Sequence, residues 1–236
     1  MKNAELFDLH TVLNDTGYIC NKKFANIVDV SWNKRPFGGA FLYGPPGSGK
    51  SYLPETLAKV YNYKLILFPC FPGTREEDLL IKLIPDDKAK SGIKTVDGPL
   101  LQAVKDCNNG DNVLLMLDEW DKTRPSADSF FLTFLQEGRI NFNGTSVEVK
   151  DPCKLKIFFT LNNERELSEP LLRRLPKIDF PLLSLDTVKK ALEITHKGHL
   201  YLEAALALYQ KGLIANLTKP ITIQELRDLL NAITRS

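Results

Sequence analysis

The sequence has little that would support a membrane, disulfide or metal-centred function. No stretch approaches the roughly 18 consecutive apolar residues of a membrane span, and the N-terminus MKNAELFDLH lacks a basic and apolar leader. The four cysteines are separated by 50, 37 and 46 residues, so none forms the C-x-x-C unit that anchors zinc. Of three histidines, His196 and His199 are spaced i, i+3, which is more typical of a solvated helix face than of a metal site. We expect a cytoplasmic protein with reduced thiols and no membrane partner.

Charge and composition narrow the possible functions and the possible domain organisation. The chain of 236 residues carries 31 Lys and Arg against 29 Asp and Glu, so its formal net charge is only +2. This balance gives no overall field that would recruit nucleic acid, so any such binding must come from local patches. With 43% hydrophobic residues, the chain can bury a sizeable core. Its length predicts one large domain, or a core with a small appendage.

Strand-like and helix-like segments alternate over the larger, N-terminal part of the chain. Short apolar runs predict buried strands at Ala40–Tyr43, Val113–Leu117 and Leu155–Leu161, with weaker ones at Lys64–Phe68 and Ile178–Phe180. Helical patterns lie between them at Lys50–Tyr61, Gly98–Cys107 and Ala127–Glu137. This alternation is typical of an α/β protein with a parallel sheet flanked by helices.

Three segments depart from this alternation. Arg139–Lys150 contains Asn-Gly between two alternating runs and predicts a β-hairpin insertion. Pro85–Lys94 is polar and is interpreted as an exposed insertion between helical patterns. After Pro181 only helical patterns follow, at Thr187–His196, Tyr201–Lys211 and Ile223–Ile233. We therefore predict an α/β domain over residues 1–183 and a small helical domain over 184–236.

A phosphate-binding loop follows the first predicted strand. The pattern G-x-x-x-x-G-K-[ST] is met by Gly44, Pro45, Pro46, Gly47, Ser48, Gly49, Lys50 and Ser51. Gly47 and Gly49 let the backbone curl so that its N–H groups point at phosphate oxygens, and the following helix adds its positive dipole end. Lys50 would neutralise the β and γ phosphates, and the Ser51 hydroxyl suits Mg²⁺. An ordinary glycine-rich turn rarely has this strand-then-helix setting.

Two acidic residues end the second predicted buried strand. Asp118 would orient a magnesium-bound water, and Glu119 would polarise the attacking water. A water-activating carboxylate distinguishes nucleotide hydrolysis from phosphoryl transfer to another substrate. An apolar run before Asp-Glu is weak evidence alone, but it is strong about 70 residues beyond a phosphate loop.

A neutral amide and a pair of arginines complete the candidate site. Asn162 follows the strand Leu155–Leu161 and could bind the water or the γ phosphate without adding repelling charge. Arg173 and Arg174 stand at a predicted helix end. They could stabilise transition-state charge from a neighbouring subunit, although cations favoured by the helix dipole are the commoner reason for such a pair.

In this order and at these intervals, the segments GPPGSGKS, LLMLDE, FFTLNN and LLRRLPKIDF resemble the Walker A, Walker B, sensor 1 and arginine-finger elements of AAA+ ATPases. From Gly44 to about Phe180 the pattern is most similar to the MoxR-like branch, which includes McrB-type and dynein-type modules. Three further segments resemble that branch: GPLLQAV before Walker B, LDEWDK after it, and FLQEGRINFNGTSVEV, which resembles its pre-sensor 1 hairpin.

This resemblance implies an ATP- and Mg²⁺-dependent ATPase with a helical lid, assembled as a homo-oligomeric ring, a hexamer, with each ATP between two subunits. Arg174 then becomes the finger acting in trans, with Arg173 second. Ile84–Asp97 falls where relatives carry the helix 2 insert, and it would project with the hairpin Arg139–Lys150 toward the pore or one face. Its lysines could touch phosphates or an acidic peptide there; they are Lys88, Lys90 and Lys94.

The lid departs from the family pattern. Many relatives carry a sensor 2 arginine where this sequence has Gln224, which cannot bring charge to the γ phosphate. Arg227 lies three residues further along, close to one helical turn, and is a weak substitute. This departure puts in doubt how tightly lid movement is linked to hydrolysis.

Four functions remain open from the sequence. The first is a ring ATPase that remodels a protein client, and the second is a DNA-associated motor or loader. The third is a nucleotide-gated scaffold that hydrolyses poorly, which the missing sensor 2 charge supports. The fourth, a phosphotransferase acting on a small molecule, fits least because Glu119 is placed for water activation.

Overall fold

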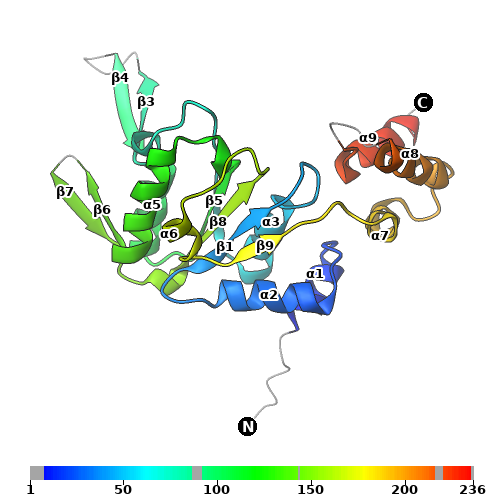
Figure 1. The fold of residues 1–236 in the computed structure, drawn as a ribbon, viewed down its shortest axis with the longest axis horizontal. Coiled ribbons are helices and arrows are strands. Elements are labelled where there is room, and N and C mark those ends of the chain that lie inside the picture. Colours follow the sequence, from blue (N-terminus) through cyan, green and yellow to red (C-terminus); the bar gives the residue numbers. More distant parts are fainter. Residues whose placement is uncertain (1–7, 87–91, 143, 216–219, 235–236) are drawn as a thin grey trace, which may run out of the picture.

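A five-stranded parallel sheet forms the centre of the molecule (Figure 1). The computed structural model describes residues 8–86, 92–142, 144–215 and 220–234. All neighbouring strands run parallel, in the spatial order β2 (Lys64–Pro69), β5 (Val113–Asp118), β8 (Leu155–Leu161), β1 (Gly38–Tyr43) and β9 (Lys177–Asp179). The predicted α/β class is confirmed, and the strand ends shift by at most two residues. Every strand therefore ends at the same edge of the sheet, where ligands bind in such folds.

The central strands are apolar on both faces because helices cover both. In β5 the side chains of Val113, Leu115 and Leu117 enter one hydrophobic core, while Leu114 and Met116 enter the other. The first core is closed by α4 (Pro99–Asn108) and α5 (Pro125–Glu137). The second is closed by α1 (Leu9–Asp15), α2 (Lys22–Trp32) and α3 (Tyr52–Tyr61). This burial explains the continuous apolar runs in the sequence.

The helices α1 and α2 were not predicted. Each begins after a polar residue whose side chain accepts a backbone N–H: Asp8 accepts from His10, and Asn21 accepts from Phe24 at 2.8 Å. Helix α1 spans only 7 residues, too few for a helical period to stand out. Helix α2 packs on β1, and α1 packs on α2 and α3, so tertiary contacts stabilise both helices.

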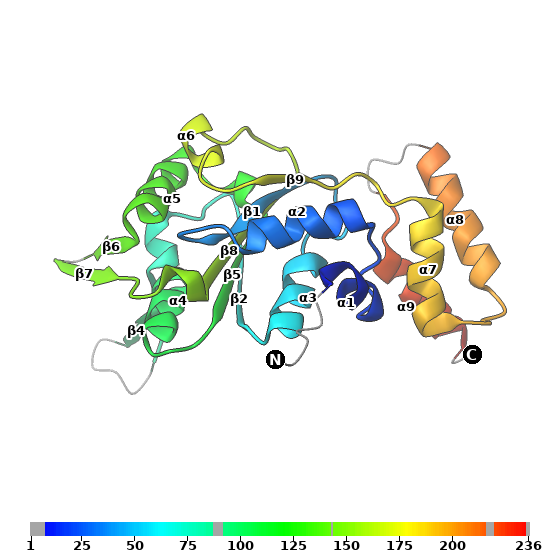
Figure 2. The same ribbon diagram turned by 90° about the horizontal axis from the view of Figure 1, so that it is seen from below.

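Two β-hairpins extend from the end of the molecule opposite α7 to α9 (Figures 1 and 2). The predicted hairpin is present as β6 (Arg139–Phe142) and β7 (Thr145–Glu148). The segment expected as an exposed insertion, Pro85–Lys94, falls within a second hairpin, β3 (Ile81–Pro85) with β4 (Ile93–Asp97). Its strands are mostly exposed on both faces, so they lack the apolar alternation by which a half-buried strand is recognised.

Three helices at the C-terminal end form a separate small core, as predicted. They are α7 (Leu185–His196), α8 (Leu202–Ile214) and α9 (Ile223–Thr234). Val188, Leu206 and Leu230 pack together between them. Short helical turns complete the fold at η1 (Glu76–Leu79), η2 (Trp120–Lys122), η3 (Pro152–Lys154) and α6 (Glu169–Leu172). No helix in the described ranges has both the length and the apolar character needed to cross a membrane.

Candidate functional site

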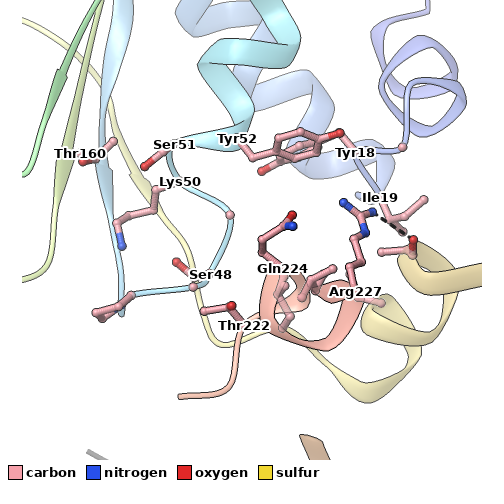
Figure 3. A pocket seen from close by; sticks show the side chains of 18 of the residues that line it. Tyr18, Ile19, Ser48, Lys50, Ser51, Tyr52, Thr160, Thr222, Gln224 and Arg227 are labelled. Carbon is pink, nitrogen blue, oxygen red and sulfur yellow. Dashed lines mark hydrogen bonds between the residues drawn. The ribbon is translucent and has the colours of Figure 1, made fainter. Parts of the chain in front are cut away.

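A cavity of about 410 Å³ lies between the carboxyl edge of the sheet and the C-terminal helices (Figure 3). One end is formed by the loop Gly44–Ser51 together with residues that end β5 and β8, including Asp118, Glu119 and Asn162. The other end is formed by residues 17–19, by Tyr52 and by side chains of α7 and α9. The predicted loop, acidic residues and amide therefore converge on one cavity.

Lys50 turns back onto its own loop. Its Nζ donates to the carbonyl oxygens of Gly44 at 2.6 Å and Pro45 at 2.8 Å, and the residue is only 6% exposed. Loss of hydration lowers the pKa of Lys50, and the nearby carboxylates of Asp118, Asp121 and Glu119 act in the opposite direction. The ammonium is thus held beside the loop, and its carbonyl partners can be exchanged for anionic oxygens.

Gly47 is the point where the loop meets the C-terminal helices. Its φ of +77° lies in the left-handed region, and a Cβ there would come within 2.6 Å of Cγ2 of Thr222, which precedes α9. Gly49 has a similar φ of +88°, but a Cβ there would meet nothing within 4 Å. Alanine at position 49 would therefore introduce backbone strain alone, whereas alanine at position 47 would also clash with Thr222.

We expect Gly47→Ala to lower the free energy of unfolding by about 2 to 4 kcal/mol, the sum of left-handed strain and overpacking. Gly49→Ala should cost only the strain, about 1 to 2 kcal/mol. Thr222→Ser removes Cγ2 and should recover the difference when it is combined with Gly47→Ala. Urea unfolding of the wild type, Gly47→Ala, Gly49→Ala and the Gly47→Ala/Thr222→Ser double variant measures these free energies. Equal losses for both glycine variants would show that Thr222 does not restrict position 47.

Asp118 receives two hydroxyl hydrogen bonds. Ser51 Oγ donates to its Oδ1 at 2.9 Å, and Thr160 Oγ1 donates to the same oxygen at 2.6 Å. Within the described ranges, no cluster of three or more His, Cys, Asp or Glu could hold a metal ion without other ligands. Ser51 and Asp118 nevertheless bring two hard oxygen atoms together at the end of the loop, and sequence reasoning did not single out Thr160.

Both carboxylate oxygens of Glu119 are engaged. Asn162 Nδ2 donates to Oε1 at 3.0 Å, and Lys122 Nζ donates to Oε2 at 2.6 Å. The backbone of Glu119 is left-handed, with φ 56° and ψ 47°, and its N–H donates to Thr160 Oγ1 at 2.9 Å. A non-glycine residue in this region stores strain that the surroundings must offset. The side chain is thus held beside Asn162, and Lys122 is a partner that sequence reasoning missed.

A buried carboxylate fixes the segment that connects Asn162 to α6. Asp128, 1% exposed, accepts hydrogen bonds from Trp120 Nε1 at 3.0 Å and from the Ser168 N–H at 3.0 Å. The two Nη atoms of Arg165 donate to its two carboxylate oxygens at 2.9 and 2.8 Å. This bidentate pair joins α5 to the loop that leads into α6.

Asp128→Asn should lower the free energy of unfolding by about 3 to 5 kcal/mol, because it leaves Arg165 without its buried counter-charge. Asp97→Asn is the matched control. Asp97 pairs with Lys105 at 2.7 Å where both side chains are more than a third exposed, so its loss should cost at most about 1 kcal/mol. Chemical denaturation measures both values, and similar losses would contradict a structural role for the Asp128 network.

Neither Arg173 nor Arg174 lines the cavity. Arg173 pairs with Glu169 on the surface, and both side chains are about three-quarters exposed. Arg174 is exposed, and within the described residues its guanidinium has no hydrogen bond or ion pair. Its backbone carbonyl accepts a hydrogen bond from Lys34 Nζ. Burial, and next the charge of Arg174, lower the pKa of Lys34. Both guanidinium groups therefore lie at the surface, and of the two only that of Arg173 has a partner among the described residues.

Two of the remaining predicted residues line the cavity. Gln224 and Arg227 both line the cavity from α9. Lys94 lies on the exposed strand β4, away from the cavity, whereas Lys88 and Lys90 fall outside the described residues. The segment 17–19, which connects α1 to α2, was missed because a short connection between helices carries no recognisable pattern of its own.

Comparisons with known proteins identify a family and a similar fold. A sequence model of the family described as the AAA domain (dynein-related subfamily) matches residues 39–175. The fold is similar to the crystal structure of a proposed ATPase from Cytophaga hutchinsonii, with a TM-score of 0.57 at 17% sequence identity. That similarity covers 95% of this chain and 62% of the other, so this chain spans less than two thirds of its neighbour. No curated protein matches the sequence.

Proposed function

Because the chain belongs to the dynein-related subfamily of AAA domains, we propose that it binds ATP with Mg²⁺ and hydrolyses the ATP. One observation carries the proposal. Lys50, Asp118, Glu119 and Asn162, which come from three separate segments, line one cavity beside the phosphate loop. A scaffold that only bound nucleotide would not require the carboxylate of Glu119 and the amide of Asn162 to be held together beside the phosphate loop.

The residues present fit a magnesium ion. Ser51 Oγ and Asp118 Oδ1 are 2.9 Å apart, and both are hard oxygen ligands of the kind that Mg²⁺ prefers. Ser51 would hold the ion directly and Asp118 through a water molecule. When bound, the ion neutralises charge that develops on the β and γ phosphates. Phosphate oxygens of the nucleotide and water molecules would supply the other ligands of the ion.

The protein groups then have separate tasks. Lys50 exchanges the carbonyl oxygens of Gly44 and Pro45 for phosphate oxygens, and the loop N–H groups bind the same phosphates. Glu119 accepts a proton from the attacking water. Asn162, which donates to Glu119 at 3.0 Å, orients this carboxylate and the water. To act as a base, Glu119 must give up at least one of the two partners that engage its oxygens.

Assembly would complete the site. The unpaired guanidinium of Arg174 lies outside its own cavity, which supports its use on the nucleotide of a neighbouring copy. We propose a homo-oligomeric ring, a hexamer, that remodels a macromolecular client, a protein complex. In this scheme residues 1–183 are the nucleotide domain and 184–236 are the lid, whose contact with Gly47 through Thr222 links it to the phosphate loop.

ATP turnover per subunit, measured against protein concentration, tests this proposal. Turnover should rise with concentration as copies share their sites. Added unfolded protein, single-stranded DNA and duplex DNA identify the class of client. Stimulation by unfolded protein supports a remodelling function, and stimulation by DNA would instead support a motor or loader. Turnover that stays at background under all conditions would contradict hydrolysis and leave a nucleotide-gated scaffold.

A further inference from the structure

The cavity is longer than the phosphate machinery. Figure 3 shows Lys50 and Ser51 at one side of the cavity, and Tyr18, Ile19 and Arg227 at the other. If the phosphates of a nucleotide lie on the loop, as proposed above, the base must lie at the second end. The side chains there therefore decide which base the site accepts.

Flat and apolar surfaces border this second end. The rings of Tyr18 and Tyr52 stack at a centroid distance of 5.8 Å. Gly17, whose φ is +89°, lies beside Tyr52, and a Cβ there would reach 3.8 Å from its hydroxyl oxygen. Ile19 and Ala191 add apolar contacts to the lining. Such a surface suits a planar heterocycle, but it does not by itself distinguish one base from another.

Arg227 brings the one cationic side chain to this end of the described cavity lining. A guanidinium has five N–H donors, and here a single hydrogen bond is made, from Nη2 to the Ala191 carbonyl oxygen at 3.2 Å. Its Nε is buried and has no hydrogen-bond partner among the described residues. Because Nε is closed to the cavity, a ligand acceptor would pair with the Nη donors, of which only one is used within the described residues.

The placement of Arg227 separates it from the phosphates. Figure 3 shows Gln224 toward the loop that carries Ser48 and Ser51, whereas Arg227 lies one turn further along α9, toward Ile19 and below the tyrosine rings. A substitute for the sensor 2 arginine would have to reach the γ phosphate. The side chain of Arg227 instead lies at the end where the base belongs.

We propose that Arg227 is a specificity residue that donates a hydrogen bond to the base of the nucleotide, at N7 of a purine. This inference rests on the proposed nucleotide function. Adenine and guanine both present N7 as an acceptor, and guanine adds O6, so the guanidinium selects purines over pyrimidines. The contact is independent of the number of phosphates, which distinguishes it from a γ-phosphate sensor.

Equilibrium titration of the full chain with ATP, ADP, GTP, CTP, 2′-deoxyATP and 7-deaza-ATP tests the proposal, because 7-deaza-ATP lacks only the N7 acceptor. The wild type should bind ATP, ADP and 2′-deoxyATP in the same range and GTP at least as tightly, because O6 adds an acceptor. It should bind 7-deaza-ATP and CTP about tenfold more weakly. Arg227→Met should weaken ATP and ADP by that same factor and should no longer distinguish ATP from 7-deaza-ATP. Arg227→Lys keeps the charge but not the planar donor set, so it should behave like Arg227→Met.

Lys211→Met is the matched control, because Lys211 is exposed on α8 and does not line this cavity. It should bind every nucleotide as the wild type does. A larger loss for ATP than for ADP in Arg227→Met would overturn the proposal in favour of a phosphate contact. Equal wild-type affinity for ATP and 7-deaza-ATP would overturn it without any variant. If 2′-deoxyATP alone bound the wild type more weakly than ATP, and Arg227→Met abolished that difference, Arg227 would be assigned to the ribose. A wild type that binds no nucleotide would instead refute the proposed function.

Discussion

Glu119→Gln should lower ATP turnover by about 10²- to 10⁴-fold, the contribution typical of a general base. The amide keeps the size of the side chain but cannot accept the proton of the attacking water. Lys50 and the phosphate loop are untouched, so ATP should still bind with nearly wild-type affinity. Steady-state phosphate release and nucleotide titration measure the two quantities separately.

Glu166→Gln is the matched control for this variant. Glu166 is exposed and does not line the cavity, so its amide should leave turnover unchanged. If Glu119→Gln kept turnover within about threefold of the wild type, the general-base assignment would be wrong. A parallel loss of ATP affinity would instead mean that Glu119 acts mainly in binding.

Arg174→Ala should reduce turnover of the assembled protein by about 10³- to 10⁵-fold, the range found for arginine fingers. The loss should appear at concentrations where wild-type turnover is at its maximum, and the affinity of dilute protein for ATP should not change. Arg173→Ala should cost far less, because the Arg173 guanidinium is already paired with Glu169 on the surface.

The two arginine variants control for each other, because they remove the same charge from adjacent positions. Size-exclusion chromatography with light scattering should accompany the assay, so that a loss of assembly is separated from a loss of catalysis. A larger defect in Arg173→Ala than in Arg174→Ala would reverse the assignment. Wild-type turnover in both would exclude this segment from the reaction.

Local signals explain why much of the fold and site could be predicted from the sequence. The buried strands read as continuous apolar runs because both faces of β5 and β8 are covered. The loop Gly44–Ser51 requires glycine, lysine and serine at fixed positions, so its chemistry is visible without the fold. Asp118 and Glu119 could be placed near it because parallel strands end at one edge of the sheet.

Features that depend on long-range contacts were not predictable. Lys122 lies three residues from Glu119, but its ion pair at 2.6 Å depends on the turn η2 and on the left-handed backbone of Glu119. Arg165 meets Asp128 across 37 residues of sequence. The hairpin of β3 and β4 has few buried side chains, so its composition is that of a loop. In these cases an unusual backbone conformation, a distant partner or solvent exposure, and not local propensity, determines the structure.

The central claim is that one active site is built by two copies of the chain, and mixing two inactive variants tests it most directly. Glu119→Gln subunits lack the general base but keep Arg174. Arg174→Ala subunits keep Glu119 but lack the arginine. If Arg174 acts on a neighbouring copy, mixed assemblies pair an intact Glu119 with an intact Arg174, and ATP turnover should return to a sizeable fraction of the wild-type rate. If Arg174 acts within its own chain, no mixture restores turnover, and mixtures as inactive as the separate variants would contradict the shared site.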